Sequence, residues 1–176
     1  MEAVELSSLL VGLMGLVTTL EWLAPFDLRV FGIVPRTEGG LVGIAFAPLL
    51  HLGFPHLLAN ALPLFVLLVL LFAQRQYRPV QTLAWIWVGS GLGTWLIGRG
   101  GAVHIGASSL IYGLVVYLIA TGWWLRNWRA LLVALAVLVF YGGIFAGVLP
   151  QRGMISWEGH LAGALAGLGV ARFHHG

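Results

Sequence analysis

Three short stretches of this chain place polar, chemically capable side chains inside apolar sequence. They are residues 51–60, 106–113 and 159–163, and they contain histidines, hydroxyl groups and an asparagine. A buried hydroxyl, amide or imidazole without a partner costs about 2–7 kcal/mol. Polar groups inside membrane segments are therefore functional candidates. A nucleophile, a base and an amide donor together indicate acyl-transfer chemistry.

Ser108 is the candidate nucleophile and His160 the candidate base, because each lies at the start of an apolar run. A structural interpretation stays open for both. A membrane serine commonly bonds to the carbonyl four residues earlier, and a histidine at a helix end can reach the interface. Tyr112 follows Ser108 by one helical turn, so its ring is expected on the same face, beside an imidazole.

A second group of candidates lies in the preceding stretch. His56 and Asn60 are four residues apart and share a helix face. They suit a pair of hydrogen-bond donors for a developing oxyanion, although Asn60 could instead bond across helices as a packing residue. His51 is expected at or before the start of that helix, off the shared face.

A third catalytic residue is not evident. Glu158 precedes His160 by two positions, about 200° round a helix, so its carboxylate is expected to point away from the imidazole. The pattern predicts a Ser-His dyad and assigns no role to His104, His174 or His175. The spacing predicts neither a metal site nor a cofactor, and a chain without cysteine has no disulfide or thiolate ligand.

The composition is that of a membrane protein. Of 176 residues, 60% are hydrophobic and 9% charged, with a mean hydropathy of +0.97; soluble domains have about 25% charged residues. We predict an all-α polytopic membrane protein with a single domain over residues 1–176. Six apolar runs approach the 20 or so residues needed to span a bilayer: 6–24, 54–73, 80–98, 106–125, 129–148 and 156–173. The dispersed net charge of +3 predicts no nucleic-acid partner.

The last run has a stripe of small residues. Gly159, Gly163 and Gly167 recur every four positions. Such a stripe predicts backbone-to-backbone packing on a neighbouring helix. That packing would bring His160 close to its partner helix.

The arginines indicate an orientation with both termini on the cytoplasmic side. Arg75, Arg78, Arg126, Arg129 and Arg172 would then lie inside, and Arg29, Arg36, Arg99 and Arg152 outside. Each inner turn has two arginines and each outer turn one. Asn60, Ser108 and His160 then each fall within about two turns of the outer start of their own span, at one depth.

These stretches resemble the rhomboid family of intramembrane serine proteases, and the resemblance covers nearly the whole chain. The family has two histidines five apart with an asparagine four later, a Gly-x-Ser motif, and a final-span histidine followed by small residues. The matching residues are His51, His56, Asn60, Gly106, Ser108, Tyr112, His160, Ala162, Gly163 and Ala164.

The resemblance implies a bacterial-type, six-helix protease in the inner membrane, with transmembrane proteins as substrates. Ser108 would attack a backbone carbonyl and His160 would take its proton. The main chain at Ser108, with His56 and Asn60, would stabilise the oxyanion. His51, Gly106 and Tyr112 would support the substrate cleft. The cut would fall near the outer end of the substrate helix, in contact with membrane lipid.

One residue departs from the family's pattern. Many members of the family have glycine after the nucleophile, where this chain has Ser109, and that difference would narrow the substrate cleft.

Two other interpretations are compatible with parts of this pattern. A catalytically silent relative that binds membrane clients is the first alternative, although this chain retains both the serine and the histidine. A small transporter is the second; it would need polar groups along a path, and no internal repeat is evident.

Overall fold

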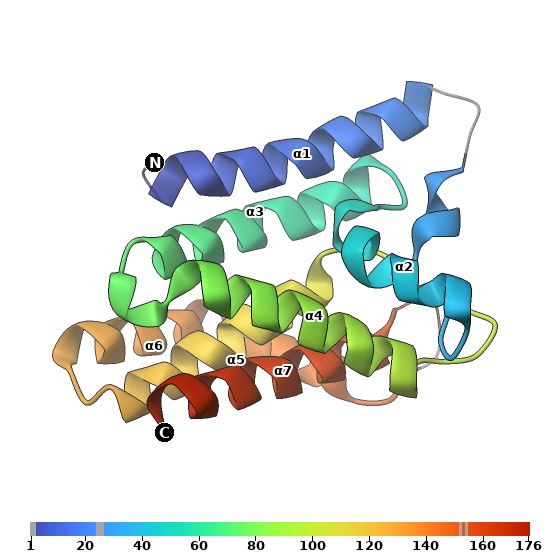
Figure 1. The fold of residues 1–176 in the computed structure, drawn as a ribbon. Helices are drawn as coiled ribbons and strands as arrows, with labels where there is room; N and C mark the ends of the chain where they lie inside the picture. The colour runs from blue at the N-terminus through green and yellow to red at the C-terminus, as the bar shows by residue number, and fades with distance from the viewer. Residues whose placement is uncertain (1–2, 24–26, 152, 154) are drawn as a thin grey trace.

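The computed structural model describes residues 3–23, 27–151, 153 and 155–176, which form a bundle of helices (Figure 1). The long helices are α1 (Ala3–Leu23), α3 (Phe54–Phe72), α4 (Pro79–Ile97), α5 (Ser108–Trp124), α6 (Trp128–Tyr141) and α7 (Trp157–His175). Shorter elements are α2 (Glu38–Phe46) and the 3-10 turns η1 (Leu28–Phe31), η2 (Ala47–Leu49), η3 (Arg75–Tyr77) and η4 (Gly142–Val148). The predicted all-α polytopic bundle is confirmed.

Each of the six predicted spans corresponds to one long helix, and five agree in their ends to within about three residues. The fifth span differs, because α6 ends at Tyr141 and the chain continues to Val148 as the 3-10 segment η4. Gly142 and Gly143 begin that segment, and paired glycines are poor formers of α-helix. Ile144 of this 3-10 segment lines the cavity described below.

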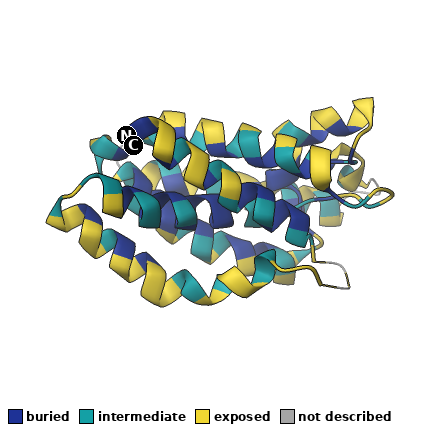
Figure 2. Cartoon of the chain, turned by 90° about the horizontal axis from the view of Figure 1, so that it is seen from below, coloured by how far each residue is buried: buried dark blue, intermediate teal, exposed yellow. Residues whose placement is uncertain are grey.

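Helix α5 lies at the centre of the bundle and packs on α3, α4, α6 and α7. Its buried side chains include Leu110, Leu114 and Leu118, while α1 and α6 expose much of their surface (Figure 2). Among the residues that the structure describes, three stretches are long and apolar enough to cross a membrane by themselves: Ala3–Leu23, Phe54–Phe72 and Trp128–Val148.

The glycine stripe of α7 packs against α5, as predicted. A Cβ atom added to Gly163 would overlap the backbone carbonyl of Ser109, and one added to Gly167 would overlap that of Gly113. Backbone atoms cannot turn aside as side chains do. The two helices therefore approach as closely as their main chains allow, and this contact fixes where the start of α7 lies relative to the start of α5.

The loop before α5 is tied to the segment between α1 and α3. Ile33 and His104 exchange two backbone hydrogen bonds of 3.0 and 2.9 Å, and the Gly106 N–H donates to the Ala47 carbonyl at 2.8 Å. Two α4 tryptophans, Trp87 and Trp95, donate indole N–H groups to backbone carbonyls of the same segment. These bonds hold the chain that leads into Ser108.

Candidate active site

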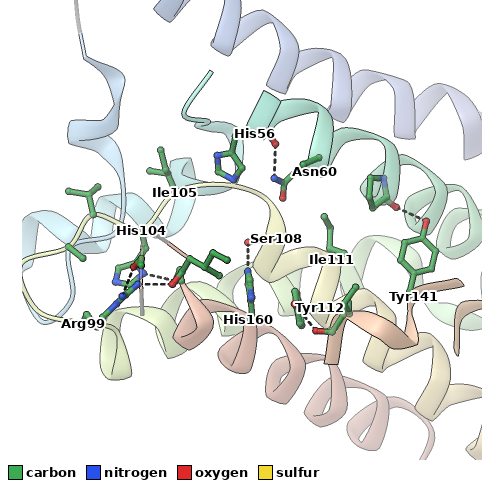
Figure 3. A pocket seen from close by; sticks show the side chains of 18 of the residues that line it. His56, Asn60, Arg99, His104, Ile105, Ser108, Ile111, Tyr112, Tyr141 and His160 are labelled. Atoms are coloured by element: carbon green, nitrogen blue, oxygen red, sulfur yellow. Dashed lines mark hydrogen bonds between the residues drawn. The ribbon is translucent and has the colours of Figure 1, made fainter. Parts of the chain in front are cut away.

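Ser108 and His160 meet at one end of the bundle (Figure 3). The Ser108 Oγ lies 3.0 Å from the Nε2 atom of His160. Ser108 is the first residue of α5, and His160 lies in the first turn of α7. The close α5–α7 contact thus brings together two residues 52 positions apart in the sequence.

The second ring nitrogen of His160 defines its tautomer. Nδ1 lies 3.0 Å from the carbonyl oxygen of Gly147 in η4. A carbonyl can only accept, so Nδ1 carries the hydrogen and donates it. In a neutral imidazole Nε2 then has the free lone pair, which can accept the Ser108 hydroxyl proton. A backbone carbonyl takes the orienting position that a carboxylate has in a catalytic triad.

Tyr112 packs beside the imidazole, as its position one turn after Ser108 predicted. The rings of Tyr112 and His160 are stacked, with centroids 4.1 Å apart and planes 9° from parallel. The Tyr112 hydroxyl donates to the Ile144 carbonyl at 2.8 Å. Gly147 lies so close that an added Cβ would overlap this hydroxyl. The roles of Ile144 and Gly147 could not be predicted from the sequence, because every residue type has a backbone carbonyl.

His56 faces this pair from α3 and has the opposite tautomer. Its Nδ1 accepts the Leu52 N–H at 3.2 Å, so in the neutral ring Nε2 carries the hydrogen. A Cβ on Gly106 would lie 2.9 Å from that Nε2 atom. Gly106 also has a φ of +104°, which an L side chain rarely adopts. Glycine is needed here for both the turn and the approach of the imidazole.

Asn60 lies one turn below His56 and points toward Ser108 (Figure 3). It is 4% exposed, and its Nδ2 donates to the His56 carbonyl on its own helix at 2.9 Å. An amide nitrogen has two hydrogens, so one N–H stays available. Its Oδ1 has no partner among the described residues. Asn60 is thus placed by α3 alone and bonds to no other helix, against the packing interpretation.

His51 precedes α3, as expected, and lies behind His56 instead of in the cavity. The two rings meet edge to face with centroids 5.1 Å apart. Burial, together with the neighbouring His56, lowers the pKa of His51 to about 4. His51 is therefore neutral near pH 7 and supports His56 through packing.

A cavity of about 790 Å³ opens beside Ser108 and His160. Its size is within the range of ligand-binding pockets. One wall comes from α3, with His56, Asn60 and Pro63, and the floor includes Ile111 of α5. Ser109 does not line this cavity. Of the two adjacent serines, only Ser108 has both an imidazole and open space beside it.

An ion pair without a sequence signature lies beside this cavity, whose lining includes Arg99. The Arg99 Nε lies 2.9 Å from the Glu158 Oε1, and the Glu158 side chain is only 2% exposed. Arg99 also donates to the carbonyls of Gly153 and Ile155, at 2.9 and 2.7 Å. Glu158 therefore pairs with Arg99 and not with His160, as its angular position predicted, and the pair fastens the start of α7.

His104, to which the sequence analysis gave no role, makes a second link to α7. Its Nδ1 lies 2.6 Å from the Ser156 Oγ, and that oxygen accepts the Gly159 N–H at 3.2 Å as the N-cap of α7. Burial lowers the pKa of His104, which therefore favours the neutral ring. The loop that leads to Ser108 and the helix that carries His160 are thus joined directly.

The fold and the site together define a polytopic helical membrane protein with a serine–imidazole pair beside a cavity. Comparison with known proteins identifies its family. The rhomboid domain family matches residues 38–175. The chain belongs to the rhomboid family and is an integral membrane protein.

Mycobacterial relatives cover most of the chain. Proteins of Mycobacterium tuberculosis and Mycobacterium bovis, each named as uncharacterized, are 44% identical over 169 residues, which is 92% of this chain and 70% of theirs. A Mycobacterium leprae protein, also named as uncharacterized, is 38% identical over 168 residues, 90% of this chain and 66% of its own. No solved structure matches significantly.

Proposed function

We propose that this protein is an intramembrane serine protease that uses Ser108 as nucleophile and His160 as general base. One observation carries the proposal: the Ser108 Oγ lies 3.0 Å from an imidazole nitrogen whose partner nitrogen is bound to the Gly147 carbonyl. That arrangement leaves a lone pair directed at the hydroxyl. It is the geometry that activates a serine for attack on an acyl carbon.

The reaction follows from these positions. Ser108 Oγ bonds to the carbonyl carbon of the scissile peptide while its proton passes to His160 Nε2. The resulting oxyanion would accept hydrogen bonds from the Ser108 main chain, from His56 Nε2–H and from the free Asn60 N–H. The C–N bond then breaks, and the leaving amine takes the proton from His160. Water, deprotonated by His160, hydrolyses the acyl-enzyme and restores Ser108.

The proposed substrates are transmembrane proteins. The cavity lies at the end of the bundle, beside the first turns of α5 and α7, so a substrate would be cut near one membrane face. We propose that this face is the outer one, with both termini in the cytoplasm of a bacterial cell. The chain has no native cysteine. A cysteine placed at Gly101 should then react with an impermeant thiol reagent added to intact cells, and one at Asn127 only after permeabilisation; the reverse would invert this orientation.

The test of the activity is covalent labelling by a fluorophosphonate in detergent, which needs no known substrate. The wild-type protein should label and should cleave a member of a panel of transmembrane substrates. Ser108→Ala should abolish both, whereas Ser109→Ala and Ser109→Gly should label as the wild type does. Loss of labelling in Ser109→Ala with labelling retained in Ser108→Ala would assign the other serine. A folded wild type that never labels would replace the protease with a silent, client-binding member of the family.

A further inference from the structure

The end of the bundle opposite Ser108 has an unusual charge. It is formed by the start of α1, the turn at residues 73–79, residues 125–129 and the last turn of α7 (Figure 1). We call it the arginine end, because it has five exposed arginines: Arg75, Arg78, Arg126, Arg129 and Arg172. In the part of the chain that the structure describes, no ion pair joins any of them to a carboxylate.

The arginines of the Ser108 end are different. Arg29 pairs with Asp27 at 2.6 Å and Arg99 with Glu158 at 2.9 Å. Arg36 donates to the carbonyls of Leu96 and Gly98 at 2.8 and 2.9 Å. Each of the three guanidinium groups that the structure describes at that end thus has a partner within the protein.

The count of charges shows the same asymmetry. Among the described residues, the Ser108 end has three arginines and four carboxylates, from Glu21, Asp27, Glu38 and Glu158. The arginine end has five arginines and one carboxylate, from Glu5. The positive charge of the described chain therefore lies at the arginine end. The number of arginines in the sequence, five on one side against four on the other, does not show this difference in charge, because it leaves out the acidic residues.

Aromatic side chains surround the same end. Trp123, Trp128 and Phe173 are 81%, 67% and 78% exposed. The Arg129 guanidinium lies over the Trp128 ring, 5.4 Å from its centre. Tryptophan collects at the depth of lipid headgroups, since its ring is apolar and its N–H is polar. These aromatics place the unpaired arginines where headgroup phosphates lie.

We propose that the arginine end binds anionic phospholipid headgroups and retains them in preference to zwitterionic ones. A guanidinium binds the phosphate that both lipid classes carry, but only an anionic headgroup has a net negative charge for the arginine to neutralise. Each arginine near an anionic membrane surface contributes roughly fivefold to binding. The inference concerns a face remote from the cavity, and it holds whether or not Ser108 is a nucleophile.

The test is competition between two lipids for the purified protein in mild detergent, with retained lipid counted by native mass spectrometry. The probes are phosphatidylglycerol and phosphatidylcholine of matched chains, in equal amounts. We expect wild-type protein to retain phosphatidylglycerol at least tenfold better. Equal retention of the two lipids would overturn the proposal. Detergent solution has no sides, so the result does not depend on the orientation in the cell.

Paired variants locate the binding. Arg75→Gln with Arg78→Gln, and Arg126→Gln with Arg129→Gln, should each lower the preference at least tenfold. Arg29→Gln with Arg36→Gln removes the same charge from the Ser108 end and should leave it within twofold. The proposal would be overturned by an equal loss of preference in this control. It would also be overturned by a preference kept when Arg75, Arg78, Arg126 and Arg129 are all glutamine.

Lysine variants and salt keep the test decisive if a glutamine variant fails to fold. Lysine at the same four positions should preserve the preference, because it preserves charge. Raising the salt concentration from about 0.1 to about 1 M shortens the screening length from about 10 to about 3 Å and should abolish the wild-type preference. A preference that persists at high salt would instead reflect apolar contact with the aromatic residues and would exclude the arginines as its cause.

Discussion

The two walls of the cavity hold their histidines in different ways. His160 lies on α7, whose backbone is packed directly on that of α5 through Gly163 and Gly167. His56 lies on α3, across the open cavity from Ser108. At Gly163 and Gly167 the α7 wall has no room for a methyl group. The α3 wall, in contrast, faces Ser108 only with side chains, those of His56 and Asn60.

The difference extends to the tautomers. The carbonyl of Gly147 makes His160 a hydrogen-bond acceptor toward Ser108, whereas the Leu52 N–H makes His56 a donor at Nε2. A backbone carbonyl thus makes the Nε2 atom of His160 an acceptor, and a backbone N–H makes the Nε2 atom of His56 a donor. We infer that changes in the α7 wall alter folding and chemistry together, while changes in the α3 wall alter chemistry alone. The following predictions test that inference, from the largest effect to the smallest.

Gly163→Ala should have the largest effect, because it should remove stability and labelling together. The added methyl would overlap the Ser109 carbonyl, so the two helices must separate. We expect a loss of about 3 kcal/mol in the free energy of unfolding together with loss of fluorophosphonate labelling. Gly169→Ala on the same helix is the control, because nothing lies within 4 Å of its added Cβ. Equal stability of the two variants would show that α7 is not packed as described.

Asn60→Ala should separate chemistry from stability. Loss of an oxyanion donor costs about 3–4 kcal/mol of transition-state stabilisation, a few hundredfold in rate. The Asn60 amide bonds only to the His56 carbonyl of its own helix, so the free energy of unfolding should change by less than about 1 kcal/mol. Cleavage rate and thermal unfolding, measured on one preparation, check this. An unchanged rate would reassign Asn60 to a structural role.

The Arg99–Glu158 pair should respond unequally to the loss of either partner. The Glu158 side chain is 2% exposed and that of Arg99 38%. Arg99→Gln leaves a buried carboxylate uncompensated, and we expect it to cost about 2–3 kcal/mol of unfolding free energy. Glu158→Gln leaves a cation that water can reach, and about 1 kcal/mol is expected. The double variant should recover part of the Arg99→Gln loss; strict additivity would mean that the two side chains act independently.

Gly147→Ala should have the smallest effect of the four. The methyl group would overlap the Tyr112 hydroxyl, which is a side-chain end and can move, but its stacked ring would then disturb His160. A misplaced base costs about tenfold in labelling rate. Gly143→Ala, in the same 3-10 segment with nothing near its added Cβ, should label normally. Equal rates would exclude η4 from positioning the base.

Much of this arrangement could be predicted from the sequence, because its determinants are side chains with characteristic spacing. Apolar runs located the long helices, and the glycine stripe indicated the α7 contact. The one-turn interval from Ser108 placed Tyr112 beside an imidazole. The roles assigned to Ser108, His160, His56 and Asn60 stay predictions until labelling and turnover are measured.

What the sequence could not provide is pairing that depends on the main chain or on distant loops. The Gly147 carbonyl orients His160, yet any residue type has a carbonyl. Arg99 and Glu158 are 59 positions apart in the chain, and neither has a motif that points to the other. The 3-10 segment η4 also escaped prediction, since its apolar composition reads as a continuation of α6.

The position of α5 has a consequence for synthesis. Ser108 enters the membrane before α7 has been translated, and the ribosome needs seconds for the intervening 52 residues. During that interval the faces of Ser109 and Gly113 that receive the α7 glycines are bare. The proposed nucleophile therefore lacks its proposed base while the chain is nascent, and the Ser108–His160 pair assembles only when the last helix arrives. If the pair is a protease centre as proposed, this order of synthesis keeps it inactive on the ribosome without any inhibitory segment.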